Sequence, residues 1–154
     1  MNDNAVVRDL YQEVILDHSR NPRNRRAMAG CSHVARSENP SCGDEVSVFL
    51  EMNDRGVIGD IAFAGRSCAI ATAAASLMTE VLVGKTPAQA RTLFDGFRAI
   101  ATGGVEAPLD GMEVELERLT SLSGLRDYPA RVTCAMLAWH AMLAALQSPK
   151  EPGV

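Results

Sequence analysis

Four cysteines are the residues of this chain whose chemistry calls for an explanation: Cys31, Cys42, Cys68 and Cys134. No two of them form a CxxC motif, which argues against a zinc ribbon and against a thioredoxin-type redox site. In a reducing compartment, widely spaced cysteines serve as metal ligands, nucleophiles or core residues more often than as disulfides. The sequence therefore directs attention to thiolate chemistry, either at a metal ion or in a nucleophilic reaction.

A predicted β-hairpin brings two of these cysteines together. Residues 45–52 alternate apolar and polar side chains, Asn53–Gly56 has turn chemistry, and residues 57–63 resume a strand. Cys42 and Cys68 lie symmetrically about this turn, and residues equidistant from the turn of an antiparallel pair face each other about 5 Å apart. That separation fits a metal ion with Zn–S bonds of about 2.3 Å. We therefore expect Cys42 and Cys68 to meet at the open end of the hairpin.

The local sequence around both cysteines suits metal ligands. Cys42 lies in the turn Pro40–Asp44, where Gly43 lets the backbone approach closely and the Asp44 carboxylate can aim at the same point. Cys68 is expected at the N-terminus of a helix, where the helix dipole stabilises a thiolate. The alternative is a turn residue and a small core residue, because free cysteine is often simply buried. Asp44 is equally well explained as a turn aspartate.

Cys134 lies on the predicted final helix, residues 129–146. At about 100° per residue the apolar side chains of this helix form one arc, and Cys134 points outside it. That direction suits a ligand facing a site that the helix flanks, although Leu137 lies near the same line. Arg131, one turn earlier, either places a guanidinium beside the thiolates or is a solvated side chain.

The remaining candidate residues fit no closed metal pattern. Cys31 lies in an arginine-rich loop that precedes the hairpin. His18 is expected at a helix C-terminus, where a positive charge is favourable, and His140 is expected to be structural. The loop arginines form either a solvated surface or a region that steers a negatively charged partner.

The elements that position these residues follow from the same patterns. A first amphipathic helix over residues 5–18 ends at Asn21-Pro22, because the residue before proline leaves the helical region. After the hairpin the chain reads as helices, which we expect at residues 68–83, from the capping box Thr86–Gln89, at 113–122 and at 129–146. This order predicts an α+β fold in which a small antiparallel sheet packs on a helical layer.

Length and composition set the class of protein. The 154 residues, 47% of them hydrophobic, predict a single domain, which we expect over residues 1–148 with a flexible C-terminal tail over 149–154. The net charge of −4 argues against sequence-independent binding of nucleic acid, which needs a strong positive excess. Neither a secretory signal nor a membrane-spanning run is evident, so we expect a cytoplasmic protein that binds no membrane.

The ordered motifs resemble the IscU/NifU-N family of iron–sulfur cluster assembly proteins, and the SufU branch most closely. The resemblance covers about residues 5–146 and rests on the segments Leu10–His18, Asn21–Asn24, Asn39–Asp44, Cys68–Ile70 and Arg131–Ala135. Thr133-Cys134 stands where the IscU scaffolds have His-Cys, and residues 103–122 match an insertion of the SufU branch. Thr133 replaces the usual lysine and Ala71 the usual serine, which bears on partner fit more than on metal binding.

This resemblance implies a SufE/NifU-like fold and a Zn²⁺ site made by Cys42, Asp44, Cys68 and Cys134. It also implies that Cys42 accepts persulfide sulfur from a SufS-type cysteine desulfurase, once the partner has replaced it as a ligand. Arg131 would balance the negative site, and the sulfur would pass to downstream SUF cluster-assembly proteins. The alternative is a scaffold that holds a transient [2Fe–2S] cluster in the same pocket, against which the missing histidine argues. A purely structural zinc ion is the third reading.

Overall fold

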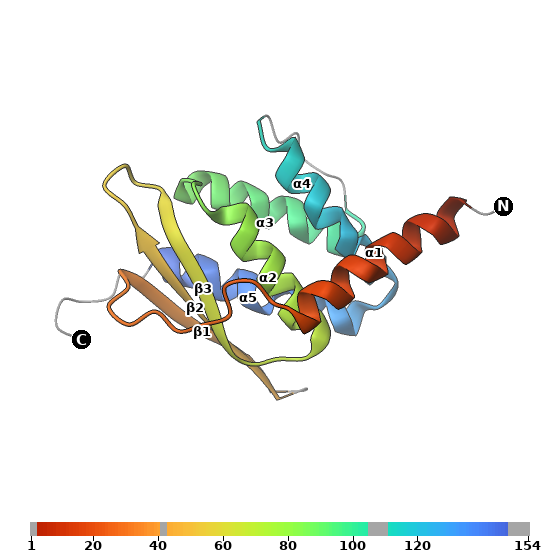
Figure 1. The fold of residues 1–154 in the computed structure, drawn as a ribbon, viewed down its shortest axis with the longest axis horizontal. Coiled ribbons are helices and arrows are strands. Elements are labelled where there is room, and N and C mark those ends of the chain that lie inside the picture. Colours follow the sequence, from red (N-terminus) through yellow and green to blue (C-terminus); the bar gives the residue numbers. More distant parts are fainter. Residues whose placement is uncertain (1–2, 41–42, 105–110, 148–154) are drawn as a thin grey trace.

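The structure of the protein is a computed structural model of the chain, and it describes residues 3–40, 43–104 and 111–147. A three-stranded antiparallel sheet lies against a layer of helices (Figure 1). The elements in chain order are α1 (Asp3–Arg20), β1 (His33–Asn39), β2 (Asp44–Met52), β3 (Ile58–Arg66), α2 (Ala69–Leu82), α3 (Pro87–Thr102), α4 (Glu113–Leu119), the 3₁₀ helix η1 (Thr120–Asp127) and α5 (Pro129–Gln147). The α+β class and the hairpin β2–β3 are confirmed.

The sheet has one more strand than the sequence predicts. The arginine-rich loop was expected to run to about Pro40, but its last part forms β1, which pairs with β2 from His33–Leu50 to Asn39–Asp44. Strand β1 is an edge strand in the order β1-β2-β3, and it carries no alternation of apolar side chains. Its pairing uses backbone hydrogen bonds, which any side chains can accompany, and for this reason the pattern did not reveal it.

The register of the hairpin determines which residues lie beside each other where β2 begins and β3 ends. Strands β2 and β3 pair without interruption from Glu45–Arg66 to Glu51–Asp60, followed by an irregularity at Met52 near the turn. The first residue of β2, Asp44, therefore lies beside the segment that leaves β3 and enters α2. The inner face of β2 is fully buried at Val46, Val48 and Leu50, and this face carries the helices.

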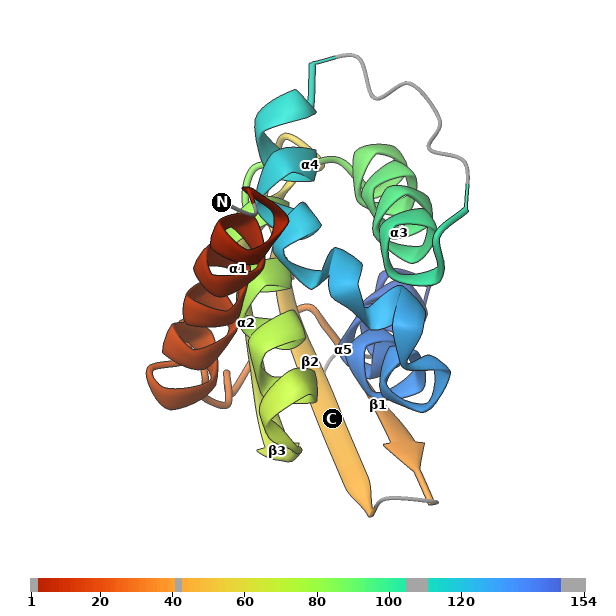
Figure 2. The same ribbon diagram turned by 90° about the vertical axis from the view of Figure 1, so that its right-hand side faces the viewer.

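Two buried helices, α2 and α5, join the sheet to the rest of the helical layer (Figure 2). Helix α2 is rich in alanine and buries eleven of its residues, which lets its neighbours approach closely. On α5, the indole ring of Trp139 is fully buried and stacks on Phe97 of α3, with 4.9 Å between the ring centroids. Helix α3 begins at the predicted capping box, in which Thr86 and Gln89 satisfy each other's backbone N–H groups.

The segment between α3 and α5 differs from its prediction. One helix over residues 113–122 was expected, whereas α4 ends at Leu119 and the chain continues as η1 to Asp127. The Ser121 hydroxyl donates to the Arg118 carbonyl at 3.1 Å, a local bond that competes with regular α-helical pairing. The single domain over residues 1–148 stays a prediction, and the expected tail lies outside the described residues.

By length and composition alone, α5 is apolar enough to cross a membrane, and it is the one such helix in the described part of the chain. Half of its most apolar window is buried inside the protein, against β1, β2 and α2. Core helices of globular proteins pass the same test, so the apolar side chains of α5 are accounted for by packing.

Candidate metal centre

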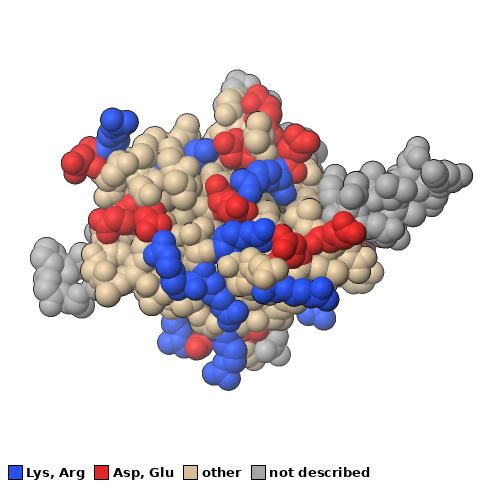
Figure 3. Space-filling model, viewed as in Figure 1, with Lys and Arg blue, Asp and Glu red and all other residues tan. Residues whose placement is uncertain are grey.

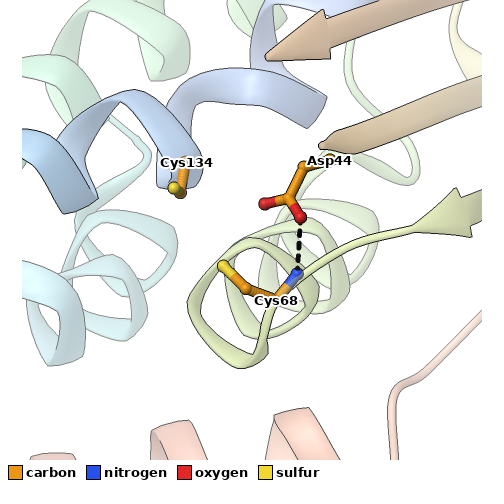
Figure 4. Close-up of side chains that lie close together, drawn as sticks. All are labelled: Asp44, Cys68 and Cys134. Atoms are coloured by element: carbon orange, nitrogen blue, oxygen red, sulfur yellow. Dashed lines mark hydrogen bonds between the residues drawn. The ribbon is translucent and has the colours of Figure 1, made fainter. Parts of the chain in front are cut away.

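Three of the four predicted ligands converge at one end of the sheet (Figure 4). Asp44 is the first residue of β2, Cys68 directly precedes α2, and Cys134 lies in the second turn of α5. One carboxylate oxygen and the two sulfur atoms lie within 4.8 Å of one another. Thiolate and carboxylate ligands around tetrahedral zinc are about 3.5 Å apart at bond lengths of about 2.0–2.3 Å. The three side chains are therefore close to the spacing that a zinc ion needs.

Asp44 carries the observation that most clearly points to a cation. The residue is only 7% exposed, and its Oδ1 accepts a hydrogen bond from the Cys68 backbone N–H at 3.2 Å. Its other oxygen, Oδ2, is buried and has no hydrogen-bond partner among the described residues. An unpaired buried carboxylate oxygen is costly. A metal ion bound between this oxygen and the two sulfurs would satisfy the oxygen. These three residues are therefore suitable ligands for a metal ion.

Cys68 is held by the start of α2. It is the N-cap residue of that helix, and its sulfur accepts the backbone N–H of Ala71 at 3.5 Å. The first backbone N–H groups of a helix lack partners within the helix, and the Cys68 sulfur supplies a partner for one of them. The neighbouring hydroxyls of Ser67 and Thr72 lie 2.7 Å apart and fix the passage from β3 into the helix.

The approach to Cys68 depends on one glycine. Gly65 has φ +124°, and a Cβ atom there would overlap the backbone carbonyl oxygen of Glu45. Any larger residue would push β3 away from β2 at the point where the strand delivers Cys68 to Asp44.

Cys134 is 5% exposed, and its Sγ donates to the Ala130 carbonyl of the preceding turn at 3.8 Å. The residues that follow it, from Ala135 to Ala138, are also buried, so burial alone does not distinguish Cys134 on this helix. Its direction does, because the side chain projects from α5 toward Asp44 and Cys68 (Figure 4).

The roles of two further predicted site residues, Cys42 and Arg131, stay predictions. Cys42 lies outside the described residues, and its role as the fourth ligand stays a prediction. Arg131 is exposed in the first turn of α5, one turn before Cys134, and it lines a groove together with Ala69 and Ile70. It forms no ion pair with any described residue, and its role at the site also stays a prediction.

The other candidates lie away from this centre. Cys31 is buried, and its thiol donates to the His33 carbonyl at 3.3 Å, which is a structural contact. His140 packs edge-on against Phe94, with ring centroids 5.2 Å apart. All three histidines of the chain are described, and none belongs to the cluster of Asp44 and the two cysteines.

His18 differs from its prediction. A favourable positive charge was expected at the end of α1, but the ring is buried and its Nδ1 lies 2.7 Å from the Ser76 hydroxyl of α2. Burial and the nearby Arg23 guanidinium lower the pKa of His18, against the opposing effect of Glu80. Burial outweighs the helix dipole here because the ring lies between two packed helices.

The sequence also failed to reveal the polar contacts around this histidine. The Ser76 hydroxyl accepts the Arg23 backbone N–H at 2.9 Å, and Asn24 donates its side-chain amide to Thr79 at 3.0 Å. Asn24 adopts a positive φ of 61° in doing so. The signal that could have found these contacts was the presence of Ser76 and Thr79 one turn apart in a mostly apolar helix.

The arginine-rich loop gathers positive charge on one face. Figure 3 shows Lys and Arg side chains across the centre of this face, where the C-terminal end of α1 and the following loop lie. Arg23 pairs with Asp17 at 2.6 Å and Arg26 with Asp60 at 2.9 Å, and both pairs are largely exposed. Exposed pairs of this kind contribute little to stability, so they leave the loop a hydrated surface.

Comparison with known proteins gives a consistent result. Residues 10–151 match the family model described as the NifU-like N terminal domain. The chain is 37% identical over 143 residues to the iron–sulfur cluster assembly scaffold protein IscU of Streptococcus pyogenes serotype M1, covering 93% of this chain and 86% of that protein. It is 34% identical over 142 residues to the zinc-dependent sulfurtransferase SufU of Bacillus subtilis strain 168, covering 92% of each.

A solved structure agrees with the arrangement of the elements. It is that of an iron–sulfur cluster assembly scaffold protein for the SUF system from Fervidobacterium islandicum AW-1. It superposes with a TM-score of 0.78 at 29% identity, over 87% of this chain and 94% of the other.

Proposed function

Because the chain belongs to the family of NifU-like N-terminal domains, which includes iron–sulfur cluster assembly proteins, we propose that it is a zinc-dependent sulfur acceptor. In this role it takes sulfane sulfur from a SufS-type cysteine desulfurase and hands it on to cluster assembly. The observation that carries the proposal is the convergence of Asp44, Cys68 and Cys134 around a buried carboxylate oxygen without a partner among the described residues.

Four residues would hold the zinc ion: Cys42, Asp44, Cys68 and Cys134. Sulfur and carboxylate ligands suit Zn²⁺, and three thiolates with one carboxylate complete a tetrahedral set. A bound zinc ion would keep the cysteines deprotonated at neutral pH. Arg131, one turn before Cys134, would offset part of the negative charge of the set.

The sulfur-transfer step is a thiol–persulfide exchange at Cys42. Its thiolate attacks the outer sulfur of the donor's cysteine persulfide, and a new S–S bond forms on Cys42. The S–S bond of the donor breaks, and its electron pair leaves on the donor's thiolate. No external oxidant or reductant takes part. Cys42 is the favoured acceptor because its sequence context predicts a turn, whereas Cys68 caps α2 and Cys134 lies on α5.

The second candidate function is a scaffold that carries a transient [2Fe–2S] cluster as cargo. A pocket rich in thiolates also suits such a cluster, and the relatives include proteins named as scaffolds. The donor set favours the zinc protein, because the cluster of candidate ligands in the described residues contains no histidine. The same family context supports downstream SUF cluster-assembly proteins as later partners and a cytoplasmic location.

The deciding experiment combines metal analysis with desulfurase turnover. We expect a colourless protein with about one zinc ion per chain that stimulates a SufS-type desulfurase. Cys42→Ser should abolish the stimulation, whereas Cys31→Ser, which removes a buried cysteine away from the centre, should preserve it. Stimulation that survives intact in Cys42→Ser contradicts the assignment. A brown protein that passes its cluster to an apo-protein supports the scaffold instead.

A further inference from the structure

A groove lies between α1, η1 and the first turns of α2 and α5, and Arg131 is the one lining residue that the function proposed above uses. Its volume is about 1030 Å³. Ile15 and Leu16 line it from α1, Ile70 from α2, Leu122 and Tyr128 from the opposite wall. Figure 2 shows η1 between α1 and α5, the arrangement that gives the groove its walls. This volume lies at the upper end of the range for small-molecule pockets, about 300–1,000 Å³, and is also large enough for a segment of polypeptide.

Apolar side chains are exposed along this groove. Leu16 is 39% and Tyr128 64% exposed, and both belong to the small set of large apolar residues that are exposed in the described chain. Half-buried Ile15 and Ile70 continue the apolar lining between them. Exposed apolar side chains gathered along a concave surface are typical of a surface that another chain covers.

The groove is continuous with the candidate metal centre. Ala69 and Ile70 line its floor, and they directly follow Cys68 in the first turn of α2. Arg131 lines the same end, one helical turn before Cys134. A chain that lies in the groove therefore ends beside two of the three converging ligands, and it can bring a reactive group to them.

The charge of the groove selects the chemistry of its occupant. Arg126 and Arg131 line it together with a single carboxylate, Asp127, so the charged side chains leave one net positive charge. Neither arginine forms an ion pair with a described residue. Arg126 is held by the carbonyls of Ser123 at 3.0 Å and Ile100 at 3.4 Å, which leaves Arg131 as the cation open to a partner. Among the groups of an unmodified polypeptide, a carboxylate is the one that pairs bidentately with a guanidinium.

A second copy of this chain is a poor occupant. Two-fold contacts place the same surface of both copies against each other, so the arginines of both grooves would meet in one interface. The groove is concave in both copies, and neither would offer the convex apolar segment that fills it.

We propose that this groove receives an extended, partly apolar segment of the sulfur-donating enzyme, with a carboxylate of that segment paired to Arg131. The proposal rests on the sulfur-acceptor function. It assigns the groove to recognition of the donor and the cysteines to chemistry, so that the donor is anchored before its persulfide approaches the metal centre.

The test places a negative charge in the groove and measures donor binding. Leu16→Glu and Tyr128→Glu each introduce a carboxylate at an exposed apolar position of the groove wall. The matched control is Val114→Glu, because Val114 of α4 is 69% exposed and lies outside the groove. Calorimetry with the purified desulfurase gives the Kd, and turnover at increasing concentrations of each variant gives the apparent KM and kcat.

We expect both groove variants to raise the Kd and the apparent KM by about tenfold or more, which is the effect of disrupting an interface anchor. The kcat at saturation and the zinc content should stay at the wild-type level, and Val114→Glu should match the wild type throughout. A Kd unchanged in Leu16→Glu and Tyr128→Glu overturns the proposal. So does a groove variant that dissociates a dimer of this chain in sedimentation while it binds the desulfurase normally.

The two proposals fail differently. If Cys42→Ser loses sulfur acceptance while the groove variants bind the desulfurase like the wild type, the sulfur-acceptor function stands and the groove assignment is wrong. If the wild type binds the desulfurase through the groove without accepting sulfur, the groove assignment stands and the acceptor function is wrong. A wild type that neither binds the enzyme nor stimulates it overturns both.

Discussion

Asp44 couples the sheet to the metal centre through its two oxygens. One oxygen accepts the Cys68 N–H, and the other is buried without a partner among the described residues. Asp44→Asn keeps the shape and one oxygen acceptor but removes the charge. We expect zinc affinity to fall by at least about tenfold, the lower end of the effect of perturbing a metal site. The metal-free variant should unfold at the same or a higher urea concentration than metal-free wild type, because a buried unpaired charge has been removed.

Competition with a chelating dye measures the affinity, and urea unfolding in a chelator measures the stability of the metal-free forms. Zinc affinity equal to that of the wild type would remove Asp44 from the ligand set.

Gly65 is the residue whose backbone most constrains the centre. Its φ is +124°, and the Cβ atom of an alanine would collide with the Glu45 carbonyl oxygen, so Gly65→Ala forces β3 to shift. We expect a loss of about 2 kcal/mol in the free energy of unfolding, the usual cost of a strained backbone position. Zinc affinity should fall as well, since the shift moves Cys68 away from Asp44.

Gly59→Ala on the same strand is the control. A Cβ atom at Gly59 meets its neighbours at 3.5 Å, an ordinary contact, and the residue has no positive φ. Urea unfolding of this variant should stay within about 0.5 kcal/mol of the wild type. Equal effects of the two substitutions would mean that the close approach at Gly65 does not constrain the strand.

At the scale of elements, a buried histidine joins α1 to α2. His18 contacts Ser76 at 2.7 Å and lies 3.5 Å from the Glu80 carboxylate. Burial, then Arg23, lowers the pKa of His18 from its ordinary value of 6.5, while Glu80 and Asp17 oppose this and Arg118 on α4 adds to it. The folded protein therefore keeps the ring neutral at a pH where the unfolded chain binds a proton.

This difference gives stability a defined pH dependence. The unfolded state binds more protons between the lowered pKa of His18 and about 6.5, so the free energy of unfolding falls as pH drops through that range. His18→Gln should flatten this dependence. Burial also lowers the pKa of His140, which would add its own pH dependence. The comparison is therefore made between the His140→Gln protein and the His18→Gln/His140→Gln protein, with urea unfolding followed between about pH 5 and 7.5. A slope unchanged by His18→Gln would mean that the ring is not neutral in the folded state.

Elements that are specified by neighbouring side chains were predictable from the sequence, and elements that depend on contacts distant along the chain were not. The β2–β3 hairpin and the capping box of α3 are indicated by side chains close together in the sequence, and both were predicted. Strand β1 was not, because an edge strand is held by backbone hydrogen bonds to β2. The hairpin predicted that Cys42 meets Cys68 and that Asp44 can aim at the same point, and the structure places Asp44 beside Cys68. The approach of Cys134 depends on how α5 packs against the sheet, which periodicity alone does not specify.

For the whole molecule, the candidate metal centre and the apolar core use different residues. Leu50, Ile61 and Trp139 are fully buried in the core, and none of them belongs to the cluster of candidate ligands. We therefore expect chelation to lower the unfolding temperature without abolishing the fold, since a metal present at about 100 times its Kd adds about 2.7 kcal/mol. Far-UV circular dichroism should keep its helical signal after chelation. Complete loss of that signal would identify the zinc ion as a structural requirement.

The ligands of the centre are widely separated along the chain, and this has a consequence for biosynthesis. A ribosome adding roughly 5–20 residues per second produces Asp44 and Cys68 seconds before Cys134 emerges on α5. A nascent polypeptide therefore presents an incomplete set of candidate ligands to a cation. If the centre holds zinc as proposed, stable capture would wait until the last helix has docked, and metal loading would report a finished fold.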